Sequence, residues 1–585
     1  MFIEKINEPK DLKNLTIEEL NILSMEIRNA LITKMSVKGG HMASNLGVVE
    51  ITVALHTVFD SPIDKIIFDV SHQSYVHKML TGRKEAFLFA DHYDDVSGYS
   101  NPEESEHDFF NIGHTSTSIS LACGMAKARD LKGEKENIIA VIGDASLDGG
   151  EAFEALNYAS ELNSGLIVVV NDNDMSIPEN HGALNKMLNF LRDNNGQVDN
   201  NYFKALGFEY LFVRNGHDYN ELINAFKKAK DVKHPIVIHC CTQKGKGYAF
   251  AEKDREKWHW ARPFDIGTGE YFGGVPKENY GALAAEYLLG KMKEDSDVVV
   301  IAASTPLCIG FNAQNRKKAG KQFIDVGIAE QNAVSMAAAI AKKGGKPVFA
   351  TNSTFYQRAY DQIEQEMCIS KCPATMIVTH ASVFGHTNDT HVGLYDMALL
   401  GNIPNLVYLA PTNWEEYRAM LEWSIEQNKV PVAIRVPWTK VYHSEREVLK
   451  DYKETNYEIV TNGEKIAILA LGSFYSIGED IVRMLKEELN ISATLINPRF
   501  ITGLDEETLD NLFVSHELVV TLEDGILNGG FGAKIAQYYG LTDMKVMNKG
   551  FTMDIPTRYI PSEWMRENRL DVDQIVEDIK TVILK

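Results

Sequence analysis

The stretch VIGDAS at residues 141–146, followed by LIVVVNDN at residues 166–173, decides how this chain folds. Each is an apolar run of strand length that ends in polar residues, and about one helix length of sequence separates the two. Because the carboxyl ends of parallel strands meet at one edge of a sheet, Asp144 and Asn173 should lie close together. With the backbone carbonyl of Met175 they form a hard oxygen set that suits Mg²⁺ and can hold a diphosphate beside it.

The same alternation of strand-like and helix-like runs continues along the chain and predicts an α/β fold with mostly parallel sheets and helices on their faces. Three segments are expected, at residues 1–270, 280–450 and 460–585. A stretch rich in Gly, Pro and aromatic residues at 263–276 breaks the pattern and is interpreted as a linker. The expected strands of the first segment are 65–70, 137–142, 166–170 and 235–240, and those of the later segments include 298–302, 374–379, 406–409 and one that begins at 465.

Composition and charge narrow the functional class. The chain has 585 residues, 44% of them hydrophobic and 24% charged, and a formal net charge of −22. This length predicts several domains. The acidic balance argues against nucleic acid and anionic membranes as partners, because neutralising phosphates requires clustered Lys and Arg. Six cysteines give no disulfide framework. With neither a secretory signal nor an apolar run of membrane-spanning length evident, a cytoplasmic enzyme is expected.

A second chemical signal is FIDVGIAEQNAV at residues 323–334. A strand that feeds Gly327 and then a helix would place Glu330 near the helix start, at the ligand-binding edge of a sheet. A glutamate in that position can also serve only as a helix-capping charge. Since Glu330 and Asp144 belong to different segments, a site that uses both must be assembled between segments.

Motifs spread over nearly the whole chain, in order, resemble those of the 1-deoxy-D-xylulose-5-phosphate synthases. They are GGHMASNLG at 39–47, DVSHQSYVHKMLTG at 69–82, GHTSTSIS at 113–120, STFYQRAYDQ at 353–362, RVP at 435–437 and NPRFI at 497–501. The Gly-Asp to Asn-Asp-Asn pattern likewise resembles a thiamine diphosphate motif, with Ala145 where Gly is usual. The resemblance implies three α/β domains of transketolase type, which bind the diphosphate with Mg²⁺, bind the pyrimidine, and form the C-terminal domain. It also implies a homodimer acting on small-molecule substrates in isoprenoid and thiamine biosynthesis.

The resemblance assigns roles to particular residues. Glu330 would hydrogen-bond the aminopyrimidine of thiamine diphosphate, so that the cofactor loses its own C2 proton. His41 and His72 would face the reacting carbon, and together with His114 and His391 they would move protons. Of these, His41, His72 and His391 are the expected catalytic histidines. The cofactor-binding set is His72, Gly113, His114, Ser116, Ser118, Gly143, Asp144, Ala145, Ser146, Asn173, Met175, Phe355 and Glu330, of which Asp144, Asn173 and Met175 hold the metal. The substrate-binding set is Arg358, Arg435, His41, His391, Ser44, Asn352 and His380, with the two arginines expected to hold an anion.

Three departures from the family pattern fall at one end of the expected site. His380 stands where an arginine is common, Thr387 where an acid is common, and Asn352 where a tyrosine is common. The cofactor end keeps its residues, so the donor chemistry should persist while the acceptor differs.

Three functions stay open from the sequence. The first is decarboxylation of pyruvate and addition of the two-carbon unit to an aldehyde, which is D-glyceraldehyde 3-phosphate in the family. The second is a transketolase-like transfer of a two-carbon ketol unit between sugar phosphates. The third is a catalytically weak homologue that only binds the cofactor, and the retained acid and histidines argue against it.

Overall fold

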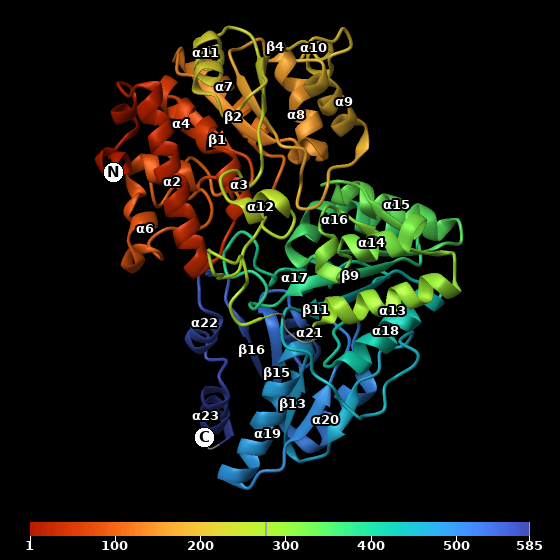
Figure 1. The fold of residues 1–585 in the computed structure, drawn as a ribbon. Coiled ribbons are helices and arrows are strands. Elements are labelled where there is room, and N and C mark those ends of the chain that lie inside the picture. The colour runs from red at the N-terminus through yellow and green to blue at the C-terminus, as the bar shows by residue number, and fades with distance from the viewer. Residues whose placement is uncertain (275–277, 584–585) are drawn as a thin grey trace. The chain divides into compact units, whose positions relative to one another are not determined.

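The computed structural model describes residues 1–274 and 278–583. Contacts within the chain divide it into two compact units. The first comprises Met1–Val275 and Gly327–Ala329, and the second comprises Pro276–Val326 and Glu330–Lys585. Figure 1 colours the elements in chain order.

The first unit is built on a parallel sheet in the order β1-β2-β3-β5-β4. Its strands are β1 (Lys65–Phe68), β2 (Ile138–Gly143), β3 (Ile167–Asp172), β4 (Glu209–Val213) and β5 (Ile236–Cys241). Its α-helices are α1 (Phe2–Lys5), α2 (Ile17–Lys38), α3 (Met42–Gly47), α4 (Val49–Val58), α5 (Tyr75–Lys78), α6 (Glu85–Leu88), α7 (Ser118–Lys132), α8 (Gly150–Glu161), α9 (Gly182–Asp193), α10 (Tyr202–Ala205), α11 (Tyr219–Ala229) and α12 (Ala249–Lys253).

Both faces of the central strands are buried, which explains why β2 is apolar throughout and why β3 is apolar up to its last two residues. Successive side chains of a strand point to opposite faces. Accordingly Ile139 and Val141 of β2 belong to one hydrophobic cluster, whereas Ile138, Ala140 and Ile142 belong to another on the opposite face. The carboxyl edge of the sheet is therefore held between two packed layers.

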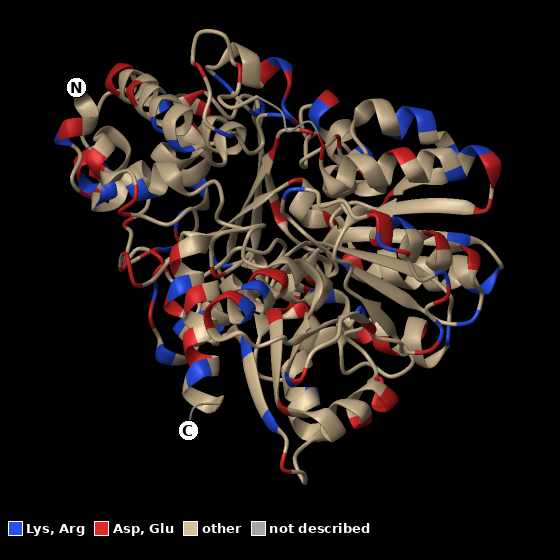
Figure 2. Cartoon of the chain, turned by 90° about the horizontal axis from the view of Figure 1, so that it is seen from below, with Lys and Arg blue, Asp and Glu red and all other residues tan. Residues whose placement is uncertain are grey.

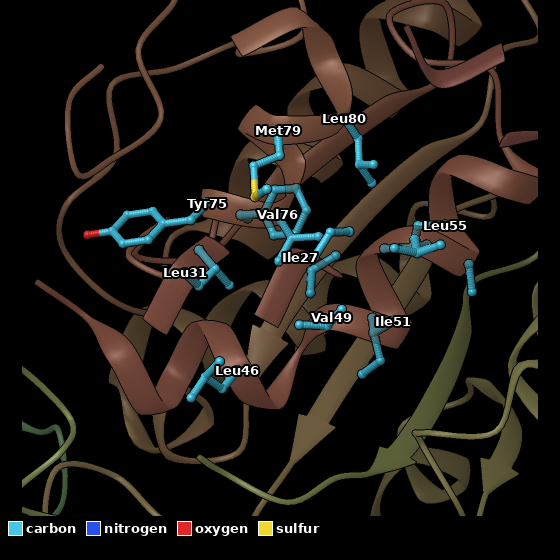
Figure 3. Packing of buried hydrophobic residues seen from close by; sticks show 14 of the residues in the cluster. Ile27, Leu31, Leu46, Val49, Ile51, Leu55, Tyr75, Val76, Met79 and Leu80 are labelled. Carbon is cyan, nitrogen blue, oxygen red and sulfur yellow. The ribbon is translucent and has the colours of Figure 1, made fainter. Parts of the chain in front are cut away.

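Two of the predicted histidines, His41 and His72, lie just before the short helices α3 and α5, and the packing of these helices fixes both segments in place. Figure 3 shows the buried side chains that gather there. They are Ile27 and Leu31 of α2, Leu46 of α3, Val49, Ile51 and Leu55 of α4, Tyr75 and Val76 of α5, and Met79 and Leu80 of the following turn η2 (Met79–Arg83). Removing one such leucine side chain typically costs about 2–5 kcal/mol.

The predicted linker at 263–276 is largely part of the first unit. Phe264 is buried, its ring lies 4.7 Å from that of Trp258, and it pairs with Tyr271 in an isolated bridge. The interpretation as a free linker is therefore wrong for this part, because its aromatic residues pack on the core. The last two residues of the predicted linker, Val275 and Pro276, lie outside the described residues.

The second unit begins with another parallel sheet, in the order β10-β11-β9-β8-β6-β7. Its strands are β6 (Val298–Ala302), β7 (Phe323–Asp325), β8 (Lys346–Asn352), β9 (Thr375–Ala381), β10 (Val407–Leu409) and β11 (Val432–Pro437). The order places β9 between β8 and β11, although they are far apart in the sequence. Figure 1 labels β9 and β11 in this sheet.

A third sheet follows in the order β12-β14-β13-β15-β16. Its strands are β12 (Glu458–Thr461), β13 (Lys465–Ala470), β14 (Thr494–Asn497), β15 (His516–Ile526) and β16 (Lys545–Phe551), and only the β12–β14 pairing among these is antiparallel. One hydrophobic cluster contains Phe349 and Met376 of the second sheet together with Leu469 and Val519 of the third. This shared core explains why the two sheets form one unit.

The α-helices of the second unit cover these two sheets. They are α13 (Tyr280–Glu294), α14 (Ala313–Ala319), α15 (Glu330–Lys342), α16 (Tyr360–Gln362), α17 (Asp396–Leu400), α18 (Trp414–Glu426), α19 (Tyr475–Leu489), α20 (Glu506–Ser515), α21 (Phe531–Tyr538), α22 (Pro561–Glu567) and α23 (Val572–Ile583). The predicted fold class is confirmed, whereas the three domain boundaries stay predictions. Lys and Arg alternate with Asp and Glu along the helices (Figure 2). Within the described residues, no helix combines the length and the apolar character needed to span a membrane.

Candidate active site

The predicted metal ligands meet at the carboxyl edge of the first sheet. Asp144 follows β2 directly, and its Oδ1 accepts a hydrogen bond from the amide N–H of Ala145 at 2.9 Å. Its Oδ2 accepts hydrogen bonds from the amide N–H groups of Asn173 and Met175, at 3.2 and 3.3 Å. The side-chain amide of Asn180, which the sequence did not single out, donates to the same oxygen at 3.0 Å.

Two amide oxygens beside this carboxylate have no hydrogen-bond partner among the described residues. The side-chain oxygens of Asn173 and Asn180 are buried and accept no hydrogen bond within the described part of the chain. Buried acceptors are normally satisfied, so orphaned oxygens next to a buried carboxylate fit a missing cation. These residues therefore suit Mg²⁺, and the assignment of Asp144, Asn173 and Met175 as ligands stays a prediction.

A second buried carboxylate, that of Asp172 at the end of β3, lies at the same edge of the sheet. Burial, and then repulsion from Asp172, raises the pKa of Asp144 well above its ordinary value. Burial acts in the same direction on Asp172, but His239 at 2.8 Å and Arg192 bind its carboxylate and lower its pKa. Asp172 thus carries the fixed negative charge, while Asp144 is the carboxylate that a bound cation would stabilise as an anion.

The GHTSTSIS segment lies against β1 through a buried aspartate. Asp69 accepts hydrogen bonds from the amide N–H groups of Ser116 and Ser118, at 2.8 and 3.0 Å. Ser116 has a left-handed backbone (φ +76°), an uncommon conformation for a residue other than glycine. Its hydroxyl donates to the carbonyl of Ser146 at 2.8 Å, whereas the buried hydroxyl of Ser118 has no partner among the described residues. The predicted diphosphate-side residues of β2 and this segment therefore lie together.

Three histidines form a cluster in the first unit. The ring of His41 lies 5.0 Å from that of His72 and 5.7 Å from that of His259, and the latter two are 5.3 Å apart. Burial lowers the pKa of His72 and of His259 well below the ordinary value, so both are neutral near pH 7. The Nδ1 atom of His72 is buried and has no partner in the described part of the chain. Neutral imidazoles can accept and donate protons, as carbonyl addition requires.

Two further residues of this cluster were missed by the sequence reasoning. Lys244 is buried, donates to the carbonyl of Ser176, and lies 3.1 Å from Nδ1 of His259. Burial lowers its pKa to about 7. The runs TQKGKGY at 242–248 and KWHWARPF at 257–264 carry Lys244 and His259, but nothing in their spacing connects them to the other motifs.

Asn45 fixes the relative position of His41 and His72. Its side-chain amide donates to the carbonyl oxygens of His41 and His72, at 2.6 and 2.8 Å. Its side-chain oxygen accepts a hydrogen bond from the amide of Tyr75 at 3.0 Å. Asn45 is buried, so these bonds are sheltered from water. The sequence placed Asn45 in a motif without giving it a role.

The remaining predicted residues of the first unit lie close by along the chain. Ser44 is half-buried on α3, one turn after His41, which precedes that helix. Ala145 is buried at the start of the short helix η4 (Ala145–Asp148). Gly143 ends β2, and Gly113 and His114 begin the GHTSTSIS segment.

In the second unit, Glu330 is the first residue of α15, and its side chain is buried. Its Oε2 accepts no hydrogen bond from the described residues. Nη1 of Arg358 lies 3.8 Å from the same oxygen. Burial raises the pKa of Glu330, and Arg358 opposes this effect. A buried carboxylate with an open oxygen is suited to accept or share a proton with a bound heterocycle.

The predicted pyrimidine and substrate residues of this unit lie in contact with one another. The ring of Phe355 lies 5.7 Å from that of His391, and His391 lies 5.3 Å from His386. The side-chain amide of Asn352 is 3.2 Å from Nε2 of His386. His380 stacks against His386 at 5.2 Å. Their assignments stay predictions, and His386 is an addition that the sequence had not suggested.

Arg435 does not have the surroundings of a substrate-binding arginine. It is buried on β11, where Nε donates to Asp396 at 2.7 Å and Nη1 donates to Asp524. Its Nη2 donates to the carbonyl oxygens of Gly393 and Asp524, each at 3.1 Å. Two buried carboxylates already balance its charge, so the expectation that it holds a substrate anion is not supported. Its guanidinium joins β11 to α17 and β15.

Comparison with known proteins agrees with the fold. The family model described as 1-deoxy-D-xylulose-5-phosphate synthase matches residues 3–200 and 194–242. The transketolase pyrimidine-binding and C-terminal domain models match residues 278–442 and 456–575. The chain is thus a thiamine diphosphate-dependent transferase of transketolase type.

Curated relatives identify the family more closely. The 1-deoxy-D-xylulose-5-phosphate synthase of Caldanaerobacter subterraneus subsp. tengcongensis is 41% identical, over 95% of this chain and 94% of its own. That of Alkaliphilus oremlandii is 39% identical, over 99% of each. The chain belongs to the 1-deoxy-D-xylulose-5-phosphate synthase family, which confirms the predicted resemblance. A transketolase mutant from Pichia stipitis is 16% identical, over 97% of this chain and 98% of its own, with a TM-score of 0.44.

Proposed function

We propose that this protein decarboxylates pyruvate and adds the resulting two-carbon unit to an aldehyde, with thiamine diphosphate and Mg²⁺ as cofactors. Two separate sets of residues support this proposal, one in each unit. The observation that carries it is the buried carboxylate of Glu330, whose Oε2 has no hydrogen-bond partner in the described part of the chain. A buried carboxylate oxygen without a hydrogen bond lowers the stability of the folded chain, and a ligand that hydrogen-bonds to it would remove this cost.

Asp144, Asn173 and Met175 would hold the Mg²⁺, and the GHTSTSIS segment would hold the diphosphate. The orphaned amide oxygen of Asn173 fits this role because Mg²⁺ prefers oxygen ligands. The amide groups now bound to Oδ2 of Asp144 keep the carboxylate in place. Asp172 orients the same edge without being a ligand itself, since His239 and Arg192 occupy its oxygens.

Glu330 would bind the aminopyrimidine, and Phe355 would stack on it. When bound, thiamine diphosphate supplies the nucleophile and the electron sink for cleaving a bond next to a carbonyl. Burial raises the pKa of Glu330, so its carboxyl can hold a proton that it shares with the heterocycle. Arg358 keeps enough positive charge nearby to let that proton leave.

The histidines would handle protons on the substrate oxygens. His41, His72 and His391 are the predicted catalytic residues, and His259 belongs with the first two by its position. Asn45 keeps the backbone of His41 and of His72 fixed, so neither histidine must be reoriented during the reaction.

The test uses the purified protein with thiamine diphosphate and Mg²⁺. We expect carbon dioxide release from pyruvate, and a condensation product of the expected mass when an aldehyde is added. Turnover of a ketose phosphate without carbon dioxide release would instead favour the transketolase-like reaction. Cofactor binding without turnover of any donor would favour the catalytically weak homologue. Glu330→Gln serves as the matched control, because it keeps the shape of the side chain and loses the carboxylate.

We further propose that the protein works as a homodimer in the cytoplasm. The resemblance to the synthases is the support for both statements. Sedimentation of the purified protein tests the first, and fractionation of cells tests the second. A monomer at micromolar concentration would contradict the dimer.

A further inference from the structure

Three neighbouring strands of the second sheet end in residues that meet at its carboxyl edge. Asn352 ends β8, His380 lies near the end of β9, and Trp438 follows β11. The pairing of β8 with β9 and of β9 with β11 brings these ends together. Ligands of parallel α/β sheets bind at this edge.

Five aromatic rings form a continuous row at this edge. The row runs from Phe355 through His391, His386 and His380 to Trp438, with ring centroids 5.7, 5.3, 5.2 and 4.2 Å apart. The last two contacts are parallel stacks, inclined by 17° and 15°. We call this set the ring row. It joins the predicted pyrimidine-stacking residue to the outer end of the edge.

The backbone holds His380 in its place within the row. His380 has a left-handed conformation (φ +52°), which is uncommon for a residue with a side chain. A Cβ atom built at Gly385 or at Gly393 would lie 2.6 or 2.4 Å from its carbonyl oxygen. The loop between these glycines therefore wraps closely around His380. An unusual conformation that the surroundings enforce is typical of functional positions.

The groups that the ring row presents are aromatic faces, which do not suit a phosphate. Binding a phosphate favours guanidinium, ammonium or N–H donors. Burial lowers the pKa of His380 well below its ordinary value, so this imidazole is neutral near pH 7. Thr379 and Asn352, which bond to His380 and His386, are uncharged as well. The ring of Trp438 is half exposed (50%) and ends the row.

We propose that the ring row is the acceptor-binding element of this enzyme, and that its outer end at Trp438 takes an uncharged, planar or apolar aldehyde rather than a phosphorylated one. The inference rests on the proposed function. His391 lies next to Phe355, towards the inner end of the row, where the reacting carbonyl would be, and Trp438 would stack on the part of the acceptor that points away from it. Trp438 is thus a residue that determines specificity.

The experiment compares three acceptors, benzaldehyde, D-glyceraldehyde and D-glyceraldehyde 3-phosphate, with pyruvate as donor. We expect the highest kcat/KM for benzaldehyde. Because an aromatic contact contributes about 0.5–1.5 kcal/mol, Trp438→Ala should raise KM for benzaldehyde about two- to twelve-fold. KM for D-glyceraldehyde should change less than about two-fold, since it has no ring to stack. Trp438→Phe should recover most of the loss.

Controls separate this inference from the proposed function. Carbon dioxide release from pyruvate by the parent protein, measured with each of the three acceptors present to take up the two-carbon unit, tests the donor reaction, so its absence with all three would refute the proposed function first. Phe513→Ala removes a similarly exposed aromatic side chain on α20 and should leave every KM unchanged. If D-glyceraldehyde 3-phosphate gave the highest kcat/KM, or if Trp438→Ala raised KM for all three acceptors equally, the ring row would not determine the acceptor.

Discussion

The carboxylate of Glu50 ties together three segments around the histidine cluster, so Glu50→Gln should destabilise the first unit. Glu50 on α4 accepts hydrogen bonds from both Nη atoms of Arg28, at 2.7 and 2.6 Å, and one from Nδ1 of His217 at 2.8 Å. Arg28 also donates to the carbonyl oxygens of Leu46 and Lys246, each at 3.1 Å. Leu46 belongs to the helix that His41 precedes, and Lys246 follows Lys244 closely.

The size of the effect follows from the pKa of Glu50. Burial would raise it, but hydrogen bonds from His217 and Arg28 outweigh burial and lower the pKa from 4.5 to about 2. A difference of about 2.5 units corresponds to about 3 kcal/mol of unfolding free energy. Because the folded pKa is the lower one, this stability is present in full above the unfolded value of 4.5. It is lost as the pH falls from there towards about 2.

Urea unfolding, sampled by a short hydrogen-exchange pulse and mass spectrometry of peptides from β2 and β3, reads this unit separately from the rest of the chain. At pH 7 the unfolding free energy of the variant should be about 3 kcal/mol below that of the parent. Near pH 3 this difference in unfolding free energy should narrow to about 1 kcal/mol. Glu161→Gln, at the exposed end of α8, should change neither value. A loss at pH 7 below about 0.5 kcal/mol, or an equal loss at both pH values, would refute the reasoning.

Three further changes test the site directly. Asp144→Ala should abolish binding of Mg²⁺ and thiamine diphosphate in calorimetry while circular dichroism stays unchanged, and unaltered affinity would remove Asp144 from the metal site. Glu330→Gln should keep the cofactor bound but suppress exchange of its C2 proton measured by NMR, and exchange as fast as in the parent would exclude that role. Asn45→Ala leaves two carbonyl oxygens and an amide without their partner, so we expect a loss of about 1–3 kcal/mol in unfolding free energy. It should also lower kcat more than cofactor affinity, and Asn45→Asp, which keeps the acceptor for Tyr75, should be intermediate.

Strand positions and strand ends could be predicted from the sequence because they depend on local pattern. The run from Ile138 to Gly143 is apolar throughout since both faces of its sheet are buried, and the polar residues begin where the strand leaves the core. The pattern of apolar runs alone therefore predicts that Asp144 and Asn173 are neighbours, and a hydrogen bond joins them in the folded chain. Strand β4 was missed because its positions are only partly buried, and the run Glu209–Val213 lacks a continuous apolar pattern.

Partners that are distant in the sequence could not be predicted in the same way. His259 joins His41 and His72, and Lys244 joins His259, across segments that share no spacing rule. Asn45 acts through two backbone carbonyl groups, one of which lies 27 residues away. A sequence pattern indicates which residue types are present, but the order of strands and the loops between them decide which of these meet.

Arg435 and Trp438 show why the type of a residue alone does not predict whether it contacts the acceptor. Arg435 and Trp438 are three residues apart, yet only the first lies within a strand that is buried on both faces. There its charge must be neutralised internally, and Asp396 and Asp524 do so, which leaves its guanidinium bound within the protein. Trp438 lies just beyond the strand end, where the chain reaches the edge that binds ligands. The position within the strand, rather than the charge of the side chain, therefore determines which of the two can contact a substrate.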